Sequence, residues 1–277
     1  MNNMDILFLK AALVVYFISA LGYLGSLYVR RVLAAKVSTW VLFTAFAFHT
    51  LFFASRYLET GQTPVISIHE TLSFFAWAMA GIYLAFQLKT KTRILGAFVS
   101  PVTFLLMIVA SAGMGGHVSL PGVLQSNLVP IHVVLAVTGE ALFALASCAG
   151  AMYLIQEGLI KNKKMSSFIR ILPSLTDLDR INHICLLWGF PLLTMGVLVG
   201  SIWARTAWGS LWQWDPKQVW TLTAWVAYAL LLHQRLAIGW KGRKAAFFSL
   251  LVFTILLVSL GVINLFFVTA HSFIMKP

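Results

Sequence analysis

Acidic residues are rare in this sequence. Only 8 of its 277 residues are Asp or Glu, against 20 Lys and Arg, and charged residues make up 10% of the chain while hydrophobic residues make up 60%. Soluble globular domains carry about 25% charged residues, so this composition excludes an ordinary soluble domain. Several apolar runs are about 20 residues long, which is the length that a helix needs to cross a bilayer. The sequence therefore predicts a polytopic membrane protein.

Cysteine is also scarce, and its placement excludes several kinds of site. Cys148 and Cys185 lie inside predicted spans, and the chain contains neither a CxxC nor a CxxCH motif. It therefore carries neither a thioredoxin-like redox pair nor a covalent c-type haem site of its own. We interpret both cysteines as small buried hydrophobic residues. No cluster of carboxylates accompanies the histidines, which argues against a hydrolytic zinc or di-iron site.

Eight apolar segments predict an all-α fold in a single integral-membrane domain, residues 1–277. The expected helices cover residues 5–28, 37–58, 70–88, 94–112, 129–156, 183–204, 217–236 and 244–270. The first apolar run is too long for a secretory signal and lacks a basic region before it, so we interpret it as the first span. The longest connection ends in "PSLTDLDR" and is expected to hold a short amphipathic piece at the membrane surface.

Lys and Arg are nearly absent from every second connection. The other connections carry almost all of them: Arg30, Arg31, Lys36, Lys89, Lys91, Arg93, Lys161, Lys163, Lys164, Arg170, Arg180, Arg235, Lys241, Arg243 and Lys244. Because basic loops stay on the cytoplasmic side, we expect these connections inside and both termini outside, in a multi-pass protein of the cell membrane. Topology thus accounts for the net charge of +12, and the bilayer, not nucleic acid, is the expected partner.

The most unusual stretch is "WGSLWQWDPKQVW", residues 208–220, in the predicted outer loop 204–220. Four Trp within 13 residues exceed an ordinary interfacial aromatic belt. Asp215-Pro216-Lys217-Gln218 has the residue order of a helix start, with Asp as the cap, Pro first and Gln closing a capping box. Once these residues are assigned to the helix start, the side chains left to form an aromatic surface are mainly Trp208, Trp212, Trp214 and Trp220.

The seven histidines are candidates for metal or haem ligands. His132 and His271 are expected at the same membrane depth as the Trp-rich loop, where two imidazoles from different helices could hold a planar metal macrocycle against indole faces. His49 and His233 are ionisable residues inside spans and hence functional-site candidates, although a hydrogen-bonded structural role is equally open for each. His69, His117 and His183 have no assigned role.

The Trp-rich stretch, with His132 before it and His271 after it, resembles the WWD signature of the haem-handling proteins of cytochrome c biogenesis, nearest to the CcsA (ResC) type of system II. The segments "TPVISIHETLSFFAW", "WVAYALLLHQRLAIGWKGRKAA" and "LGVINLFFVTAHSF" are also similar to that family, so the resemblance covers most of the chain. Two departures are Gln218, where the family usually has Glu, and His69, where an aromatic residue is more usual.

The resemblance implies a haem b transport and presentation subunit of a cytochrome c synthase. Such a subunit delivers non-covalently bound haem to the outer side of the membrane for attachment to the CxxCH cysteines of apocytochrome c, together with a CcsB (ResB) type membrane partner. It implies that His132 and His271 bind the iron, that His233 belongs to an inner haem site, and that His49 is a weaker candidate. The implied haem-contacting residues are Trp208, Gly209, Trp212, Trp214, Asp215 and Trp220.

Other functions stay open at this stage. A CcmC-like role in haem delivery to a chaperone is disfavoured by the number of spans, and a HemX-like regulator of haem synthesis is disfavoured by the Trp-rich loop. A plain transporter would show inverted repeats and helices broken by Gly or Pro, which the sequence does not show. Whether the chain is an enzyme by itself is also open.

Overall fold

The computed structural model describes residues 3–65, 67–90, 92–114, 122, 125–163 and 171–266. Its elements are α1 (Asn3–Val29), α2 (Val32–Thr60), α3 (Ile68–Lys89), η1 (Arg93–Leu95), α4 (Gly96–Ala112), α5 (Leu128–Lys161), α6 (Leu175–Trp208), α7 (Pro216–Leu236) and α8 (Arg243–Phe266). The expectation of an all-α fold with eight long helices is confirmed.

Six spans in the described part of the chain are long and apolar enough to cross a membrane: α1, α2, α3, α4 with the preceding η1, α5 and α6. The expectation of eight spans is thus supported for six of them. Helix α7 is long enough but less apolar, because polar residues interrupt its sequence at both ends: Lys217, Gln218, His233, Gln234 and Arg235.

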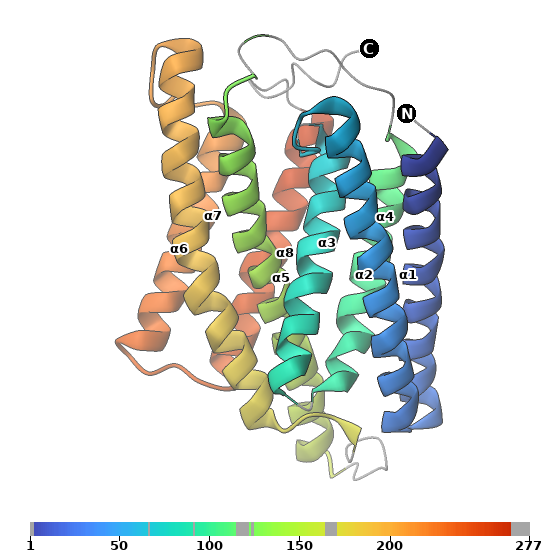
Figure 1. Cartoon of the computed structure of the whole chain (residues 1–277). Helices are drawn as coiled ribbons and strands as arrows, with labels where there is room; N and C mark the ends of the chain where they lie inside the picture. The colour runs from blue at the N-terminus through green and yellow to red at the C-terminus, as the bar shows by residue number, and fades with distance from the viewer. Residues whose placement is uncertain are drawn as a thin grey trace.

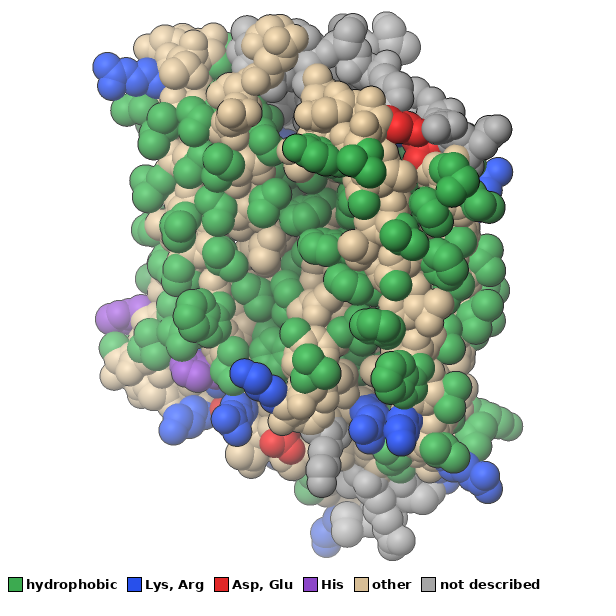
Figure 2. All heavy atoms as spheres, viewed as in Figure 1, with side chains coloured by type: hydrophobic (Ala, Val, Ile, Leu, Met, Phe, Trp, Pro, Cys, Tyr) green, Lys and Arg blue, Asp and Glu red, His purple; other side chains and the backbone are tan. Residues whose placement is uncertain are grey.

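The helices run side by side and alternate in direction, so their connections gather at two ends (Figure 1). One end, called the Trp-rich end, holds residues 61–65, 67 and 209–215. The other, called the basic end, holds the connections α1–α2, α3–α4 and α7–α8. Figure 2 shows hydrophobic side chains over the middle of the molecule and most of the visible Lys and Arg near the basic end. The connections rich in Lys and Arg therefore lie at one end and those with few at the other, as the sequence predicted.

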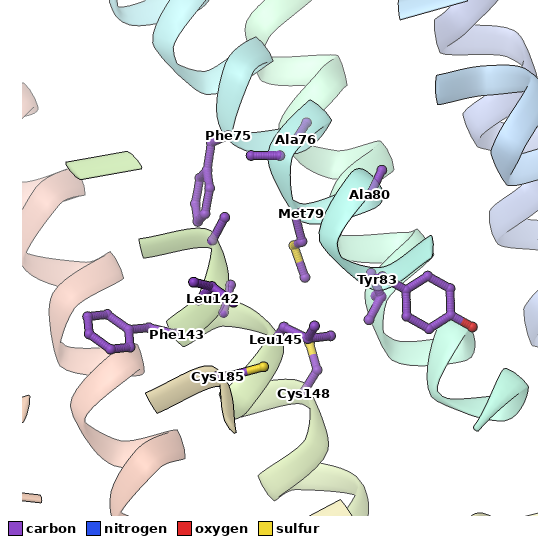
Figure 3. Close-up of a cluster of buried hydrophobic side chains, with 14 of the residues drawn as sticks. Phe75, Ala76, Met79, Ala80, Tyr83, Leu142, Phe143, Leu145, Cys148 and Cys185 are labelled. Carbon is purple, nitrogen blue, oxygen red and sulfur yellow. The ribbon is translucent and has the colours of Figure 1, made fainter. Parts of the chain in front are cut away.

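The helices form two groups, α1–α4 and α5–α8, which meet mainly where α3 packs against α5. Met79 of α3 and Leu145 of α5 are completely buried there, and Figure 3 shows them facing each other across this seam. Cys148 and Cys185 lie beside them, and both are buried and free, as interpreted from the sequence. The side chains of Phe75, Met79, Leu142 and Leu145 at this seam are all apolar and buried.

A buried ionic cluster ties α1, α2 and α3 together at the Trp-rich end. Nε of Arg56 donates to Glu70 over 2.9 Å, and its guanidinium lies 3.7 Å from Asp5. Glu70 also closes a capping box with Ser67 at the start of α3. Because such charges are costly in a low-dielectric interior unless they are paired, this cluster fixes how the three helices meet.

Helix α6 begins eight residues earlier than expected. Ser174 caps it, accepting from the backbone N–H of Asp177 over 3.0 Å. The segment "PSLTDLDR" is therefore the start of α6. The connection in which a short amphipathic piece was expected includes residues 164–170, which lie outside the described residues, so that expectation stays a prediction. Tertiary contacts explain the extension: Asp179 pairs with Arg235 of α7 over 2.8 Å and accepts from the N–H of Gly242. Arg235 also donates to Asn182 and His183.

Candidate functional site

The Trp-rich connection begins with a sharp end to α6. Gly209 takes the left-handed conformation with φ 76°, and its N–H bonds to the carbonyl of Arg205. Trp208 is thus the last helical residue, where a loop residue was expected. The next turn is held by Ser210, whose hydroxyl donates to the carbonyl of Trp212 over 2.7 Å. Trp214 has φ 53°, so the chain turns sharply again just before α7.

Asp215 is the N-cap of α7, as the sequence predicted. Its carboxylate accepts from the N–H of Lys217 over 3.1 Å, and Pro216 occupies the first helical position. Gln218 acts differently from the expected capping box: its Oε1 accepts from the N–H of Gln213 over 2.8 Å. The turn at Trp214 brings Gln213 into this position. Gln218 therefore fixes the Trp-rich connection to the first turn of α7.

The Trp side chains form two close pairs and one separate residue. Trp208 meets Trp203 edge to face with ring centroids 4.8 Å apart, and Trp212 meets Trp214 at 6.0 Å. Trp214 is 73% exposed. Trp220 lies apart from them, in a groove between α7 and α8 lined also by Ala224, Ala227 and Val252. The connection thus presents indole surface while Trp203 is buried beneath it.

One polar atom of this segment has no partner. Nε1 of Trp212 is buried and makes no hydrogen bond within the described residues. A buried donor without an acceptor costs about 1–3 kcal/mol. Such an orphaned donor is a feature of sites that are completed by a ligand or by water.

His132 lies on the first turns of α5 and is fixed by α6. Its Nδ1 lies 2.7 Å from the carbonyl oxygen of Gly196. Because a carbonyl can only accept, Nδ1 carries the proton, and Nε2 retains its lone pair in the neutral ring. Metal-binding histidines are oriented in this way, with one ring nitrogen donating to a carbonyl or carboxylate and the other facing the metal.

Glycines make the contact between α5 and α6 close enough for this bond. A Cβ at Gly196 would lie 2.8 Å from the backbone nitrogen of Ala136, and one at Gly139 would lie 2.8 Å from that of Leu193. A Cβ at Gly200 would lie 2.6 Å from Nδ1 of His132. Small residues that let backbones approach are typical of helix contacts in membranes, and here they also set the position of the imidazole.

The other predicted haem ligand, His271, lies outside the described residues, as does His117. The predicted pairing of His132 with His271 therefore stays a prediction. In the described part of the chain, no group of three or more His, Cys, Asp and Glu could hold a metal ion.

His49 lies in the middle of the α1–α4 group and is completely buried. Its Nε2 is 2.8 Å from the hydroxyl of Ser73 and its Nδ1 is 3.3 Å from that of Tyr16. The ring also stacks on Phe53, with centroids 4.8 Å apart. Both ring nitrogens are engaged by this chain, which is the arrangement of a structural histidine that joins α1, α2 and α3.

His233, unlike the buried His49, has an exposed side chain. It lies near the basic end of α7 and is exposed, and no hydrogen bond of its ring is found within the described residues. It shares a face of α7 with Val219, Val226 and Leu230, which are also exposed. His183 lies nearby in the fold, where its Nδ1 accepts from Arg235 over 2.9 Å.

His69 lies at the Trp-rich end but on the other helix group. Its Nδ1 donates to the carbonyl of Val109 over 3.2 Å, and its ring lies against Gly113. The ring thus ties the start of α3 to the end of α4.

Glu140 and Lys217 are two residues that the sequence analysis did not single out. Glu140 lies two turns after His132 on α5, and Lys217 lies on the first turn of α7. A signal was present, because an ionisable residue inside a span is a functional candidate by default.

Together these features define a class: an all-helical, multi-span membrane protein whose Trp-rich end carries an oriented histidine. Comparison with known proteins gives the family. The sequence model of the family described as "Cytochrome C assembly protein" matches residues 65–271, more than half of the chain. The chain therefore belongs to the cytochrome c assembly protein family.

Proteins named cytochrome c biogenesis protein CcsA are similar in sequence to most of the chain. The cytochrome c biogenesis protein CcsA of Chlamydomonas reinhardtii is 32% identical over 231 residues, which are 79% of this chain and 63% of that protein. The CcsA of Trieres chinensis is 29% identical over 256 residues, 80% of this chain and 82% of the relative. The CcsA of Synechocystis sp. is 26% identical over 279 residues, 81% and 84% respectively. The chain is thus similar to proteins named CcsA over about four fifths of its length, and it spans 63% of the length of the Chlamydomonas protein.

Proposed function

We propose that this protein binds haem b and presents it at the Trp-rich end for covalent attachment to the CxxCH cysteines of apocytochrome c. Family membership and the similarity to proteins named CcsA support this proposal. The single observation that carries it is the orientation of His132. Its Nδ1 is held by the Gly196 carbonyl over 2.7 Å, which leaves Nε2 as a ligand for iron.

The Trp-rich end offers side chains that suit a porphyrin. Indole faces of the Trp-rich connection are flat and apolar, and the buried Nε1 of Trp212 has no acceptor in the described part of the chain. When bound, haem supplies the iron and the reactive vinyl groups. This chain's residues would bind and orient it: His132 and His271 at the iron, and Trp208, Trp212, Trp214 and Trp220 at the ring. Gly209 and Asp215 would shape the connection by ending α6 and capping α7.

An inner haem site shared with a second protein would account for His233. Ionisable residues within a membrane normally face the bundle interior, yet His233 is exposed on the outer surface of α7. A CcsB-type partner that packs against this face would bury the ring and could supply the second ligand. The adjacent network of Arg235 with Asp179 would keep this end of α7 fixed. His49, with both ring nitrogens engaged, is better suited to a structural role.

The orientation of the chain forms part of the proposal. The basic end would face the cytoplasm, because Lys and Arg mark cytoplasmic loops, and all eight helices would span. Haem would then enter near His233 and leave from the Trp-rich end on the outer side, in a cell membrane.

The experiment that tests the function is a visible spectrum of the protein purified with a CcsB-type partner. We expect a bis-histidine b-type haem spectrum that is weakened by His132→Ala and by His271→Ala and restored by added imidazole. His69→Ala is the matched control, because it removes a histidine from the same end without changing the spectrum. Haem-free protein, or spectra that are indifferent to both ligand substitutions, would refute the proposal and leave a regulator of haem synthesis as the better reading.

A further inference from the structure

Backbone hydrogen bonds shape the connection between α7 and α8. The N–H of Trp240 bonds to the carbonyl of Gln234 over 3.0 Å and so closes the end of α7. The N–H of Gly242 donates to the carboxylate of Asp179 over 2.9 Å. Gly239 and Gly242 lie in the left-handed region, with φ 81° and 60°, which glycine adopts without strain. The side chains of the lysines in this segment take no part in these bonds.

Lys241 and Lys244 lie at the start of α8 with exposed side chains. Neither forms an ion pair within the described residues, and the nearby carboxylates of Asp179 and Glu157 are paired with other basic side chains, over 2.8 and 2.9 Å. The ammonium of Lys244 lies 5.6 Å from the centroid of the Trp240 ring, a cation–π contact that holds the lysine without neutralising it. Two positive charges thus lack an anion from the described part of the chain, in a connection that extends sideways from the bundle (Figure 1).

An exposed apolar stripe begins beside Lys244 and runs along α8. Phe248, Leu251 and Ile255 follow the lysine at intervals of four, three and four residues, which places all four side chains on one face of the helix. The three apolar side chains are exposed. The ring of Trp240 packs against that of Phe248, with centroids 5.1 Å apart. The positive charge at the start of α8 is therefore continuous with the apolar stripe.

The stripe ends in an apolar groove between α7 and α8. Ile255 lines this groove together with residues of both helices, among them Val252, Ala224 and Ala227. A helix rises 1.5 Å per residue, so the groove lies about 16 Å along α8 from Lys244. That length is about half of the hydrocarbon core of a bilayer, which is about 30 Å thick. The stripe therefore has the reach of an acyl chain within one leaflet.

We propose that the start of α8 binds one anionic phospholipid. Its phosphate lies against the ammonium groups of Lys241 and Lys244, and one acyl chain follows Phe248 and Leu251 to the groove at Ile255. Basic side chains at a membrane surface attract anionic headgroups, and a hydrogen bond between an ammonium and a phosphate is charge-assisted. A zwitterionic lipid has the same chains, but its headgroup adds a cation beside the two lysines. The site therefore selects the lipid by headgroup charge.

The test compares two lipids that differ only in the headgroup. Dioleoyl phosphatidylglycerol and dioleoyl phosphatidylcholine are titrated into the delipidated full-length protein in detergent, and native mass spectrometry counts the lipids bound. We expect tighter binding of phosphatidylglycerol. The double variant Lys241→Gln, Lys244→Gln should weaken that binding about thirtyfold, the usual contribution of two lysines at an anionic surface, and leave phosphatidylcholine unchanged. Leu251→Asn acts on the acyl chain and should weaken both lipids alike. Thermal unfolding without lipid checks that each variant is folded.

The matched control is the double variant Lys36→Gln, Lys89→Gln, which removes the same charge from exposed positions on α2 and α3 at the basic end and should bind both lipids as the natural protein does. Three outcomes would overturn the inference: equal binding of the two lipids by the natural protein, an equal loss in the control variant, or displacement of phosphatidylglycerol by inorganic phosphate at the same concentration. The proposed function is tested separately by the spectrum of His132→Ala.

Discussion

Gly200 of α6 faces the imidazole of His132 so closely that a Cβ at this position would lie 2.6 Å from Nδ1. The imidazole is therefore held between a hydrogen bond to Gly196 and the bare backbone of Gly200. Its orientation depends on the absence of a side chain on the opposite helix.

The first prediction concerns this contact. Gly200→Ala should displace the His132 ring and lower haem retention about tenfold, as expected when the support of a metal ligand is disturbed. The measurement is Soret absorbance per protein after purification, with added imidazole restoring part of it. Gly25→Ala is the control, because a Cβ there meets nothing within 4 Å. Normal haem content in Gly200→Ala would show that His132 is not positioned by α6 in the way described.

The second prediction concerns the ionic cluster at the Trp-rich end. Glu70→Gln should lower the free energy of unfolding by about 3 kcal/mol, because it leaves the buried charge of Arg56 poorly compensated. Thermal denaturation of the detergent-solubilised protein measures the change. Lys161→Met, which breaks a pair with Glu157 whose lysine is 58% exposed, should have almost no effect. Equal stability of both variants would argue against a structural role for the cluster.

The third prediction concerns Arg235. Its guanidinium donates to Asp179, Asn182 and His183 in different directions, a geometry that an ammonium cannot reproduce. Arg235→Lys should therefore destabilise the protein by about 2–3 kcal/mol, the sum of a few net hydrogen bonds. Arg243→Lys, at a side chain that is 66% exposed, is the control for the same measurement of unfolding. If the two variants unfold alike, the network does not hold α6 and α7.

The fourth prediction separates structure from ligation at His49. His49→Ala leaves the hydroxyls of Tyr16 and Ser73 unpaired in a dry interior, so stability should fall by about 2–4 kcal/mol. The visible spectrum of the surviving folded protein should be that of the wild type. A change of the haem spectrum on this substitution would assign His49 to a haem site instead.

The fifth prediction concerns orientation. Both natural cysteines are buried, so a cysteine introduced at Ser210 can be followed alone with a membrane-impermeant thiol reagent. In intact cells or spheroplasts, Ser210→Cys should be labelled from outside, and Lys241→Cys at the basic end should be labelled only after the membrane is breached. The reverse pattern would invert the proposed topology.

The helices were predictable from the sequence because span length and hydropathy are local properties. The cap at Asp215 was predictable for the same reason, since its carboxylate accepts from an N–H only two residues further along the chain. The start of α6 at Leu175 was not, because Asp179 is held there by Arg235, a residue more than fifty positions away. The partner of Gln218 was missed because the backbone turn at Trp214 could not be foreseen from residue type.

The candidate site was predictable only in part. Histidines could be sorted by depth, and the Trp-rich segment stood out by composition. The orientation of His132 depends on glycines of another helix, which a single sequence does not assign to a contact.

The close contact between α5 and α6 also limits how the molecule can move. With backbone against backbone at Gly139 and Gly196, neither helix can rotate about its axis without a clash, and separating them would leave a void that no side chain can fill. We therefore expect α5 and α6 to move together as one rigid pair. A rearrangement within this helix group is expected instead where α7 meets α6, because that contact is much less extensive.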